Sequence, residues 1–173
     1  KAKKILLIED ACESHGATFK GRKVGTFGDI SNFSFYFAHH MSTVEGGMVC
    51  TNDETLYQMT RVLRSHGMLR EATSETFRKR YENQYPDLNP KFIFLYPSGN
   101  FRNTELNAVI GRSQLHRLDS NNRKRQTNFE SFLGRLNPDR FRIDYDLIGC
   151  VNYALILILK HPDSRFRDRI TCR

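Results

Sequence analysis

Two adjacent histidines, His39 and His40, stand between two runs that are apolar or aromatic, residues 33–37 and 48–51. Aromatic and branched residues favour β-strands, so we expect a strand, a loop that carries the histidines, and a return strand. Imidazole is the side chain that titrates closest to neutral pH, so a histidine at the end of a strand suits proton transfer. Because neighbouring side chains of an extended chain point in opposite directions, we expect only one of the two to face a site.

A carboxylate is the second candidate for chemistry. The aliphatic run Ile5–Ile8 predicts a strand that is buried on both faces of a parallel sheet, and Glu9 and Asp10 end that run. In open α/β sheets ligands bind at the carboxyl ends of strands, so Asp10 is in the right place for a ligand. A turn or a helix N-cap is the alternative interpretation of this aspartate.

Turn residues and hydrophobic spacing indicate the elements that must position these side chains. Glycine-bearing turns between His15 and Asp29 predict two short strands with a tight return. Two prolines and many charged residues predict a loop excursion over 68–96. The other expected elements are helices at 54–66, 103–115 and 118–136 and a strand at 151–160.

The composition is that of an ordinary globular protein. The 173 residues are 39% hydrophobic and 27% charged, and the longest apolar run, Ala154–Leu159, is much shorter than the roughly 20 residues of a membrane span. No cleavable signal pattern opens the chain, so we expect a cytoplasmic protein without a membrane partner. The net charge of +8 suits a solvated basic surface, because the arginine-rich segments carry no nucleic-acid motif.

The four cysteines indicate free thiols. They are widely spaced and form no Cys-x-x-Cys pair, so buried, unpaired thiols are the expectation. They are Cys12, Cys50, Cys150 and Cys172.

The histidine segment carries a family resemblance. Ser34-Phe35, His39 and Glu45-Gly46-Gly47 resemble the active-site segment of the DegT/DnrJ/StrS sugar aminotransferases. In most members a lysine stands in place of His39, and this lysine holds pyridoxal phosphate (PLP) as a Schiff base. Most members also have glycine in place of Val44. An imidazole forms no such bond, so ordinary transamination is not expected.

The run 35–41, Phe-Tyr-Phe-Ala-His-His-Met, is similar to the dehydratase branch of that family, to which GDP-4-keto-6-deoxymannose 3-dehydratases belong. In that branch the histidine takes a proton while the sugar loses its hydroxyl at carbon 3. The resemblance therefore implies that His39 is the catalytic base in C-3 dehydration of a nucleotide-linked 4-keto-6-deoxy sugar, within deoxysugar or lipopolysaccharide biosynthesis.

The resemblance also implies residues that bind the cofactor. Asp10 corresponds to the aspartate that bonds the pyridine nitrogen, and Ser34 to the serine that binds the phosphate. Glu13 stands where other members have glutamine or histidine near the phenolic oxygen, so it either tunes the ring or faces solvent.

A second stretch, residues 99–115, resembles the family's Gly-Tyr-Asn-Tyr-Arg segment and the helix that follows it. There the asparagine approaches the cofactor phosphate of the other subunit, which implies that role for Asn100. Arg102 either joins it or forms a structural pair. His66 corresponds to a second histidine near the active site, and capping of the preceding helix is the alternative.

The fold that the resemblance implies is α/β, with the mostly parallel sheet of an aspartate aminotransferase-like large domain. We expect residues 1–118 to be the second half of the PLP-binding large domain, and 119–173 to be the linking helix and the start of a truncated small C-terminal domain. Family members are considerably longer, so a fragment is expected. The implied partners are PLP or pyridoxamine phosphate (PMP), glutamate as amino donor, and a second copy that shares the active sites.

Three alternatives stay open at this point. The chain could be a family aminotransferase, or a non-catalytic relative that has lost its lysine. It could be a metal-binding module that uses His39, His40, His66 and Cys12. The irregular spacing of these residues disfavours a metal site, so we expect none. It could also be a nucleic-acid-binding module, which its charge alone would support.

Overall fold

The structure is a computed structural model that describes residues 5–161. Its centre is a three-stranded sheet, formed by β1 (Ile8–Asp10), β4 (Ile30–Ser34) and β5 (Gly47–Cys50) in the order β1-β4-β5. β1 runs parallel to β4, with Asp10 opposite Asn32, and β5 runs antiparallel to β4. The predicted strand, histidine loop and return strand are therefore confirmed.

The predicted pair of short strands is also confirmed. β2 (Thr18–Phe19) and β3 (Arg22–Lys23) form a small antiparallel hairpin in the segment of chain that connects β1 to β4. Glu9 fixes the turn after this hairpin, since its carboxylate accepts hydrogen bonds from the backbone N–H groups of Gly25, Phe27 and Gly28 at 2.5–2.7 Å. Burial alone would raise the pKa of Glu9, but these three donors outweigh it and the pKa lies below its usual range.

The prediction that Ile5–Ile8 is a strand buried on both faces is wrong. β1 begins only at Ile8, and the side chains of Ile5, Leu6 and Leu7 are 77%, 60% and 49% exposed. Within the described residues β1 pairs with β4 alone, so no second neighbouring strand covers the preceding apolar residues. Met48 and Val49 of β5 are half exposed for the same reason.

Helix α1 (Glu54–Arg64) confirms the predicted helix at 54–66 and ends two residues earlier. Asp53 caps its start by accepting a hydrogen bond from the Leu56 N–H at 2.8 Å. It ends before Gly67, whose φ of +75° favours glycine and whose missing Cβ would collide with the Tyr96 carbonyl oxygen.

The loop expected at 68–96 contains helices, so that prediction is wrong in part. The structure has two short 3₁₀ helices, η1 (Leu69–Glu71) and η2 (Pro90–Phe92), around helix α2 (Glu75–Gln84). None of the α2 residues is buried, so no apolar stripe marks the helix in the sequence. A cap at Ser74 and an ion pair between Glu75 and Lys79 at 2.6 Å stabilise it instead.

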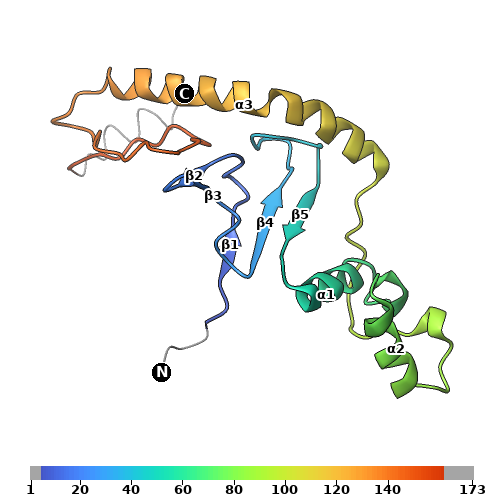
Figure 1. The fold of residues 1–173 in the computed structure, drawn as a ribbon. Coiled ribbons are helices and arrows are strands. Elements are labelled where there is room, and N and C mark those ends of the chain that lie inside the picture. The colour runs from blue at the N-terminus through green and yellow to red at the C-terminus, as the bar shows by residue number, and fades with distance from the viewer. Residues whose placement is uncertain (1–4, 162–173) are drawn as a thin grey trace.

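The helix predicted at 103–115 and its predicted basic continuation at 118–136 form one helix, α3 (Glu105–Leu133), which crosses above the end of the sheet at which β4 stops (Figure 1). Thr104 and Asn107 form a capping box at its start. The domain boundary predicted between residues 118 and 119 falls inside this helix and stays a prediction.

The strand predicted at 151–160 is wrong. Only an isolated bridge between Phe141 and Leu159 forms there, in which the Arg142 N–H donates to the Ile158 carbonyl oxygen and the Lys160 N–H to the Arg140 carbonyl oxygen. The run contacts one short partner segment over a few residues, so it forms no regular strand. Residues 155–158 remain exposed as a result.

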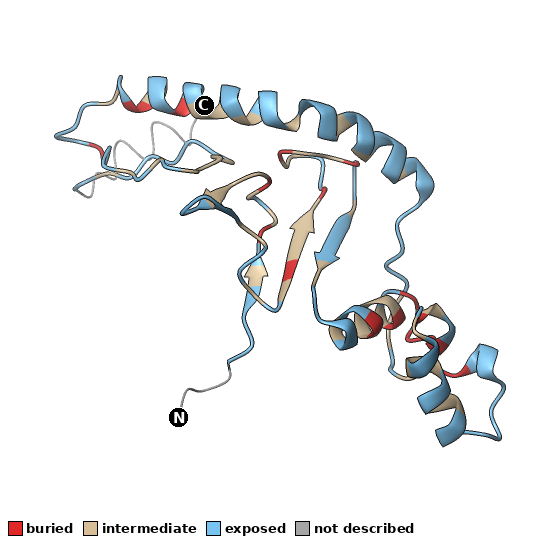
Figure 2. Ribbon diagram, viewed as in Figure 1, coloured by how far each residue is buried: buried red, intermediate tan, exposed pale blue. Residues whose placement is uncertain are grey.

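The buried residues gather in three places: where α1 meets the segment after it, beneath the C-terminal part of α3, and around β4 and the histidine loop (Figure 2). In the first two places apolar side chains pack together, whereas the third group is largely polar. The first group includes Val62, Met68, Leu69, Ala72 and Ile93, the second includes Phe129, Leu133 and Phe141, and the third includes Ala11, His15, Ser31, Phe35, His40 and Thr43.

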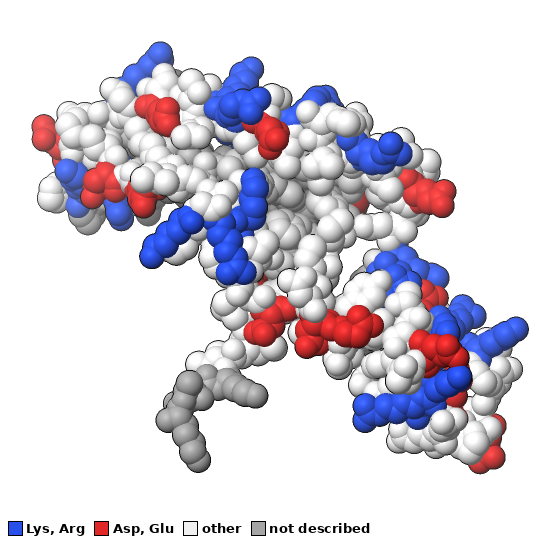
Figure 3. Space-filling model, in the orientation of Figure 1, with Lys and Arg blue, Asp and Glu red and all other residues white. Residues whose placement is uncertain are grey.

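The Lys and Arg side chains are spread over the surface of the protein and do not form one patch in the view of Figure 3. In the view of Figure 3 the Lys and Arg side chains lie along α3, on the hairpin and around α2, with Asp and Glu interspersed. Among residues 5–161 no helix combines the length and the apolar character that crossing a bilayer requires. The expected cytoplasmic setting stays a prediction.

A buried glutamine joins α1 to the start of α2. Gln58 is 1% exposed, and its amide oxygen accepts hydrogen bonds from the backbone N–H groups of Thr73 and Ser74 at 2.8 and 3.3 Å. Its amide nitrogen donates to Glu54 and to the Thr73 hydroxyl at 2.7 and 2.9 Å. The side chain thereby satisfies four groups at the junction of the two helices.

We expect Gln58→Leu to lower the free energy of unfolding by about 1–3 kcal/mol, because the substitution leaves polar groups at this junction without partners. Urea denaturation measures the change. Gln126→Leu is the control, since the Gln126 side chain donates to the exposed Glu130 one turn along α3, and a change within about 0.5 kcal/mol is expected there. Equal effects of the two substitutions would contradict the role of Gln58.

Candidate active site

Asp10 lies at the carboxyl end of β1, beside the end of β4. Its Oδ1 accepts hydrogen bonds from the Cys12 N–H and from the Asn32 side chain, both at 3.2 Å. The Cys12 side chain, the Cys12 N–H and Asn32 together hold the pKa of this exposed carboxyl below its usual range. Asp10 is therefore an anion that is held by Asn32 of β4 and by the backbone of Cys12. The bond to the Cys12 N–H also stabilises the turn that follows β1, so the turn interpretation applies as well.

The Cys12 thiol next to Asp10 is not a nucleophile at neutral pH. Burial and the nearby Asp10 carboxylate raise its pKa to about 11. Its sulfur accepts a hydrogen bond from the Asn32 amide at 3.1 Å. Cys12, Cys50 and Cys150 are free thiols, as predicted, but they are partly and not fully buried. Cys172 lies outside the described residues.

His39 lies in the loop after β4, and its two ring nitrogens have different neighbours. Nδ1 is 3.3 Å from the Ser34 carbonyl oxygen, and Nε2 is 3.7 Å from the Glu13 Oε1. A carbonyl oxygen only accepts, so this contact assigns the proton of the neutral ring to Nδ1. Nε2 is then free to accept a proton, and the Glu13 carboxylate attracts a proton that is bound there.

Only 11% of the His39 side chain is exposed, whereas 54% of the Glu13 side chain is. The contact between them is a feature that sequence reasoning missed, since it assigned Glu13 to the cofactor or to solvent. The spacing offered one signal, because Glu13 follows β1 and His39 follows the paired strand β4. The assignment of Glu13 to the cofactor stays a prediction.

Ser34 is the last residue of β4 and lies opposite Gly47 of β5. Its hydroxyl oxygen accepts a weak hydrogen bond from the Tyr36 N–H at 3.3 Å. In the described part of the chain no hydrogen bond has this hydroxyl as its donor, so its hydrogen can point to a ligand. Asp10 and Ser34 thus flank the same edge of the sheet.

His40 contacts different partners from His39, as expected for adjacent residues. It is 4% exposed, and its Nε2 is 3.2 Å from the Val151 carbonyl oxygen. Its ring lies 5.8 Å from the ring of His15, which in turn packs against the rings of Phe33 and Phe35. Both nitrogens of His15 are buried, with no hydrogen-bond partner among the residues described.

The start of α3 closes the loop that carries His39. The Asn107 side chain donates hydrogen bonds to the carbonyl oxygens of Thr43 and Glu45 at 2.9 and 3.1 Å. Asn103 donates to the Gly47 carbonyl oxygen at 3.2 Å. The sequence indicated a helix start here, but not that the capping residues also hold the histidine loop.

The predicted residues His66, Asn100 and Arg102 form a separate group near α1. The His66 N–H donates to the Gly99 carbonyl oxygen at 2.8 Å, and Asn100 Oδ1 accepts from Arg102 N–H and Nε at 3.3 and 3.0 Å. Arg102 is also 4.0 Å from Glu71, so a structural pair is present. Between residues 5 and 161 no hydrogen bond or ion pair joins this group to Asp10, Ser34 or His39, and its functional roles stay predictions.

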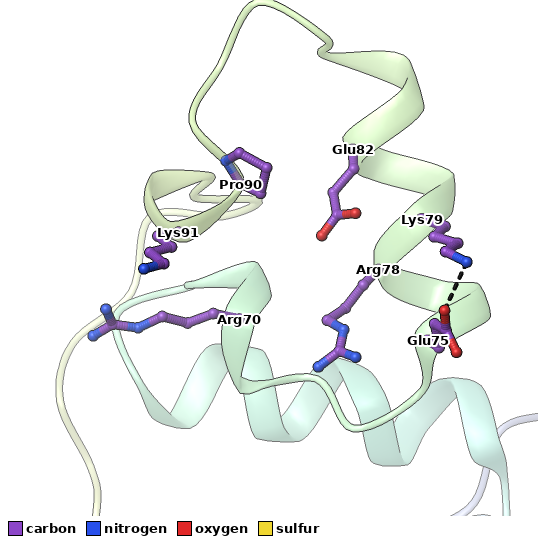
Figure 4. Close-up of a pocket in the computed structure, with 7 residues that line it drawn as sticks. All are labelled: Arg70, Glu75, Arg78, Lys79, Glu82, Pro90 and Lys91. Atoms are coloured by element: carbon purple, nitrogen blue, oxygen red, sulfur yellow. Dashed lines mark ion pairs between the residues drawn. The ribbon is translucent and has the colours of Figure 1, made fainter.

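A shallow pocket of about 270 Å³ lies elsewhere, on the α2 excursion (Figure 4). None of its lining residues is a predicted site residue. They are Arg70, Glu75, Arg78, Lys79, Glu82, Pro90 and Lys91. The described residues also contain no group of three or more His, Cys, Asp or Glu side chains that could hold a metal ion, so the metal-binding alternative gains no support.

Comparison with known proteins connects this arrangement to a family. A profile of the DegT/DnrJ/EryC1/StrS aminotransferase family matches residues 1–140. The chain is 36% identical over 133 residues to a GDP-4-keto-6-deoxy-D-mannose 3-dehydratase of Escherichia coli O55:H7, which covers 76% of this chain and 34% of the relative. It is 38% identical over 115 residues to a GDP-perosamine synthase of Caulobacter vibrioides, covering 66% of this chain and 26% of that protein.

The fold is also similar to solved structures. The crystallised E. coli GDP-4-keto-6-deoxy-D-mannose 3-dehydratase with bound hydrated PLP superposes with a TM-score of 0.63 at 32% identity, over 81% of this chain and 36% of that one. This similarity confirms the predicted α/β, aspartate aminotransferase-like fold. The chain spans about a third of the length of the dehydratases that it matches.

The buried His15 generates a prediction about pH. Burial, and then the proximity of His40 and His39, lower the pKa of His15 from its ordinary 6.5 to about 4. The unfolded chain therefore binds a proton that the folded chain does not bind between these values, so stability falls as pH falls from 6.5 to 4. His40 adds an effect of the same sign, because burial lowers its pKa as well.

We expect His15→Phe, which keeps an aromatic ring against Phe33 and Phe35, to reduce the stability lost between pH 7 and pH 5 by about 1–2 kcal/mol. Urea midpoints across that range measure the difference. His116→Phe is the control, since His116 is exposed on α3. Identical pH profiles for the His15 variant and the unmodified protein would contradict the buried, neutral state of His15.

Proposed function

Because the chain belongs to the DegT/DnrJ/EryC1/StrS aminotransferase family, we propose that it serves the C-3 dehydration of a nucleotide-linked 4-keto-6-deoxy sugar. GDP-4-keto-6-deoxymannose is the proposed substrate, PLP or PMP the cofactor and glutamate the amino donor. The observation that carries the proposal is His39, an imidazole with a free Nε2 where most family members have the cofactor-binding lysine. Relatives 36% and 38% identical that are GDP-4-keto-6-deoxy-D-mannose 3-dehydratases support the same activity.

The residues at the sheet edge fit such a cofactor. Asp10 is an exposed anion, held by donors from two strands, which suits a protonated pyridine nitrogen. Ser34 offers a hydroxyl donor at the same edge, which suits a phosphate. When bound, PLP or PMP supplies a ring that accepts the electrons of a bond broken next to it.

In this proposal His39 is the general base. Its Nδ1 is oriented by the Ser34 carbonyl oxygen, so the proton that it removes is received at Nε2. Glu13 then lies 3.7 Å from that proton-bearing nitrogen and stabilises its charge. Because the His39 side chain is largely buried, solvent has little access to the proton during transfer.

We also propose a dimer that shares its active sites. Asn100 and Arg102 lie in a group of their own, away from the contacts of His39, which suits residues that serve the site of a second copy. Asn100 would approach the cofactor phosphate of the partner subunit, and Arg102 would either join it or remain in its structural pair. His66 would lie near the active site as a second histidine.

An aminotransferase is the second candidate function. The GDP-perosamine synthase of Caulobacter vibrioides is as similar in sequence as the dehydratases are. The side chain at position 39 argues against it, since an imidazole does not provide the amine that holds the cofactor covalently.

The direct test incubates the protein with PLP, glutamate and GDP-4-keto-6-deoxymannose and identifies the sugar product by mass spectrometry. We expect a sugar that lacks the carbon-3 oxygen, and a roughly 100-fold or greater loss of its formation in His39→Asn, the range of general-base effects. His116→Asn, at an exposed position on α3, should retain full activity. An amino sugar would support the second candidate, and unchanged substrate would contradict both.

A second prediction concerns the cofactor alone. His39→Lys restores the amine of the aminotransferases, so borohydride treatment in the presence of PLP should fix the cofactor permanently to Lys at this position. The mass of the intact protein and of its peptides measures this attachment. His39→Gln, which has no amine, is the matched control. If the lysine variant acquires no more cofactor than the glutamine variant, position 39 does not face the cofactor.

A further inference from the structure

Tyr153 packs against the proposed base from a distant part of the chain. Its ring lies 5.4 Å from the ring of His39 at an interplanar angle of 79°, and 6.0 Å from the ring of His40. It follows α3 in the sequence and lies beyond residues 1–140, which the family profile matches. The family profile therefore assigns no role to this tyrosine.

We propose that Tyr153 is a positioning residue that holds the imidazole of His39 in the orientation in which Nε2 faces Glu13. The proposal rests on the proposed role of His39 as the base. His39 has an aromatic neighbour in Tyr36 as well, with ring centroids 5.6 Å apart at 72°. Two aromatic rings in edge-to-face contact restrict rotation of the imidazole, while Ser34 and Glu13 define its preferred orientation.

Three elements hold the backbone around Tyr153. His40 Nε2 of the histidine loop contacts the Val151 carbonyl oxygen at 3.2 Å, and Arg125 of α3 donates to the Tyr153 carbonyl oxygen at 3.2 Å. The Thr18 N–H of the hairpin donates to the Gly149 carbonyl oxygen at 2.8 Å. The backbone that carries the tyrosine ring is therefore held by the main body of the fold.

These contacts also give His40 a use that its sequence position did not reveal. The Val151 oxygen only accepts, so Nε2 of His40 carries the donated proton. His40 thereby tethers the segment whose tyrosine covers His39. The two adjacent histidines then have different tasks, one in proton transfer and one in anchoring the residue that orients it.

The test uses the protein without cofactor or sugar and compares Tyr153→Leu with Tyr153→Phe. Histidine ring-proton resonances, assigned by His→Gln substitution, report the environment of His39, and diethylpyrocarbonate modification followed by peptide mass spectrometry reports its accessibility. In Tyr153→Leu we expect the His39 resonances to shift and its modification rate to rise roughly two- to tenfold, the range for loss of one aromatic pair. Tyr153→Phe keeps the ring and should restore both values.

Tyr145→Leu is the matched control, because Tyr145 lies in the same segment but packs on Phe129 of α3 and not on His39. The proposal is overturned if Tyr153→Leu leaves His39 unchanged, or if Tyr145→Leu changes it equally. Should the leucine variant not fold, a nuclear Overhauser contact between the rings of Tyr153 and His39 in the unmodified protein supports the proposal, and its absence overturns it. Because neither measurement depends on turnover, failure of the dehydration assay would leave this result interpretable.

Discussion

The parallel pairing of β1 with β4 is the constraint on which the candidate site depends. With Asp10 opposite Asn32, the carboxyl ends of both strands meet at one edge of the sheet. Asp10 ends the first strand there and Glu13 follows it, while Ser34 ends the second strand and His39 follows it. A shift of this register by one residue would turn every side chain of one strand to the other face, so Asn32 would no longer bond Asp10 and Glu13 would lose its contact with His39.

The loop between β4 and β5 must also be held, because it carries the imidazole on a segment without regular structure. Three kinds of contact hold it. The ring bonds back to Ser34 at the end of the strand, Asn107 at the start of α3 binds two carbonyl oxygens of the loop, and Tyr153 covers the ring. Only the first is local in sequence, so the geometry of His39 depends on α3 and on the segment after it.

That difference between local and distant contacts explains what the sequence could predict. The strands around the histidines, helix α1 and the turn strands follow from local periodicity and turn residues, and the structure confirms them. The burial of Ile5–Ile8 and a strand at 151–160 depended on partner strands, which no local pattern reveals, and both predictions were wrong. Helix α2 was missed because its residues form no apolar stripe, and its stability comes from a cap and an ion pair.

The site shows the same division. Asp10, Ser34 and His39 were found from their positions at strand ends and from a family resemblance, and the structure brings them to one edge of the sheet. The pairing of Glu13 with His39, the tether from His40 to Val151 and the contact of Tyr153 join residues whose partners lie on other elements. Sequence spacing does not determine such contacts, since they depend on how the elements pack.

The proposed chemistry depends on position 39 more than on the overall similarity of the chain to its relatives. A GDP-4-keto-6-deoxy-D-mannose 3-dehydratase and a GDP-perosamine synthase are 36% and 38% identical to it, so the degree of identity does not decide which of the two this chain resembles in its reaction. An amine at this position would bind the cofactor covalently, whereas an imidazole with its Nδ1 committed to Ser34 offers a base and no covalent bond. A carboxylate beside Nε2 is useful to the second arrangement, because it stabilises a proton that the ring has just received. The pairing of His39 with Glu13 is therefore a stronger argument for proton removal than either residue is alone.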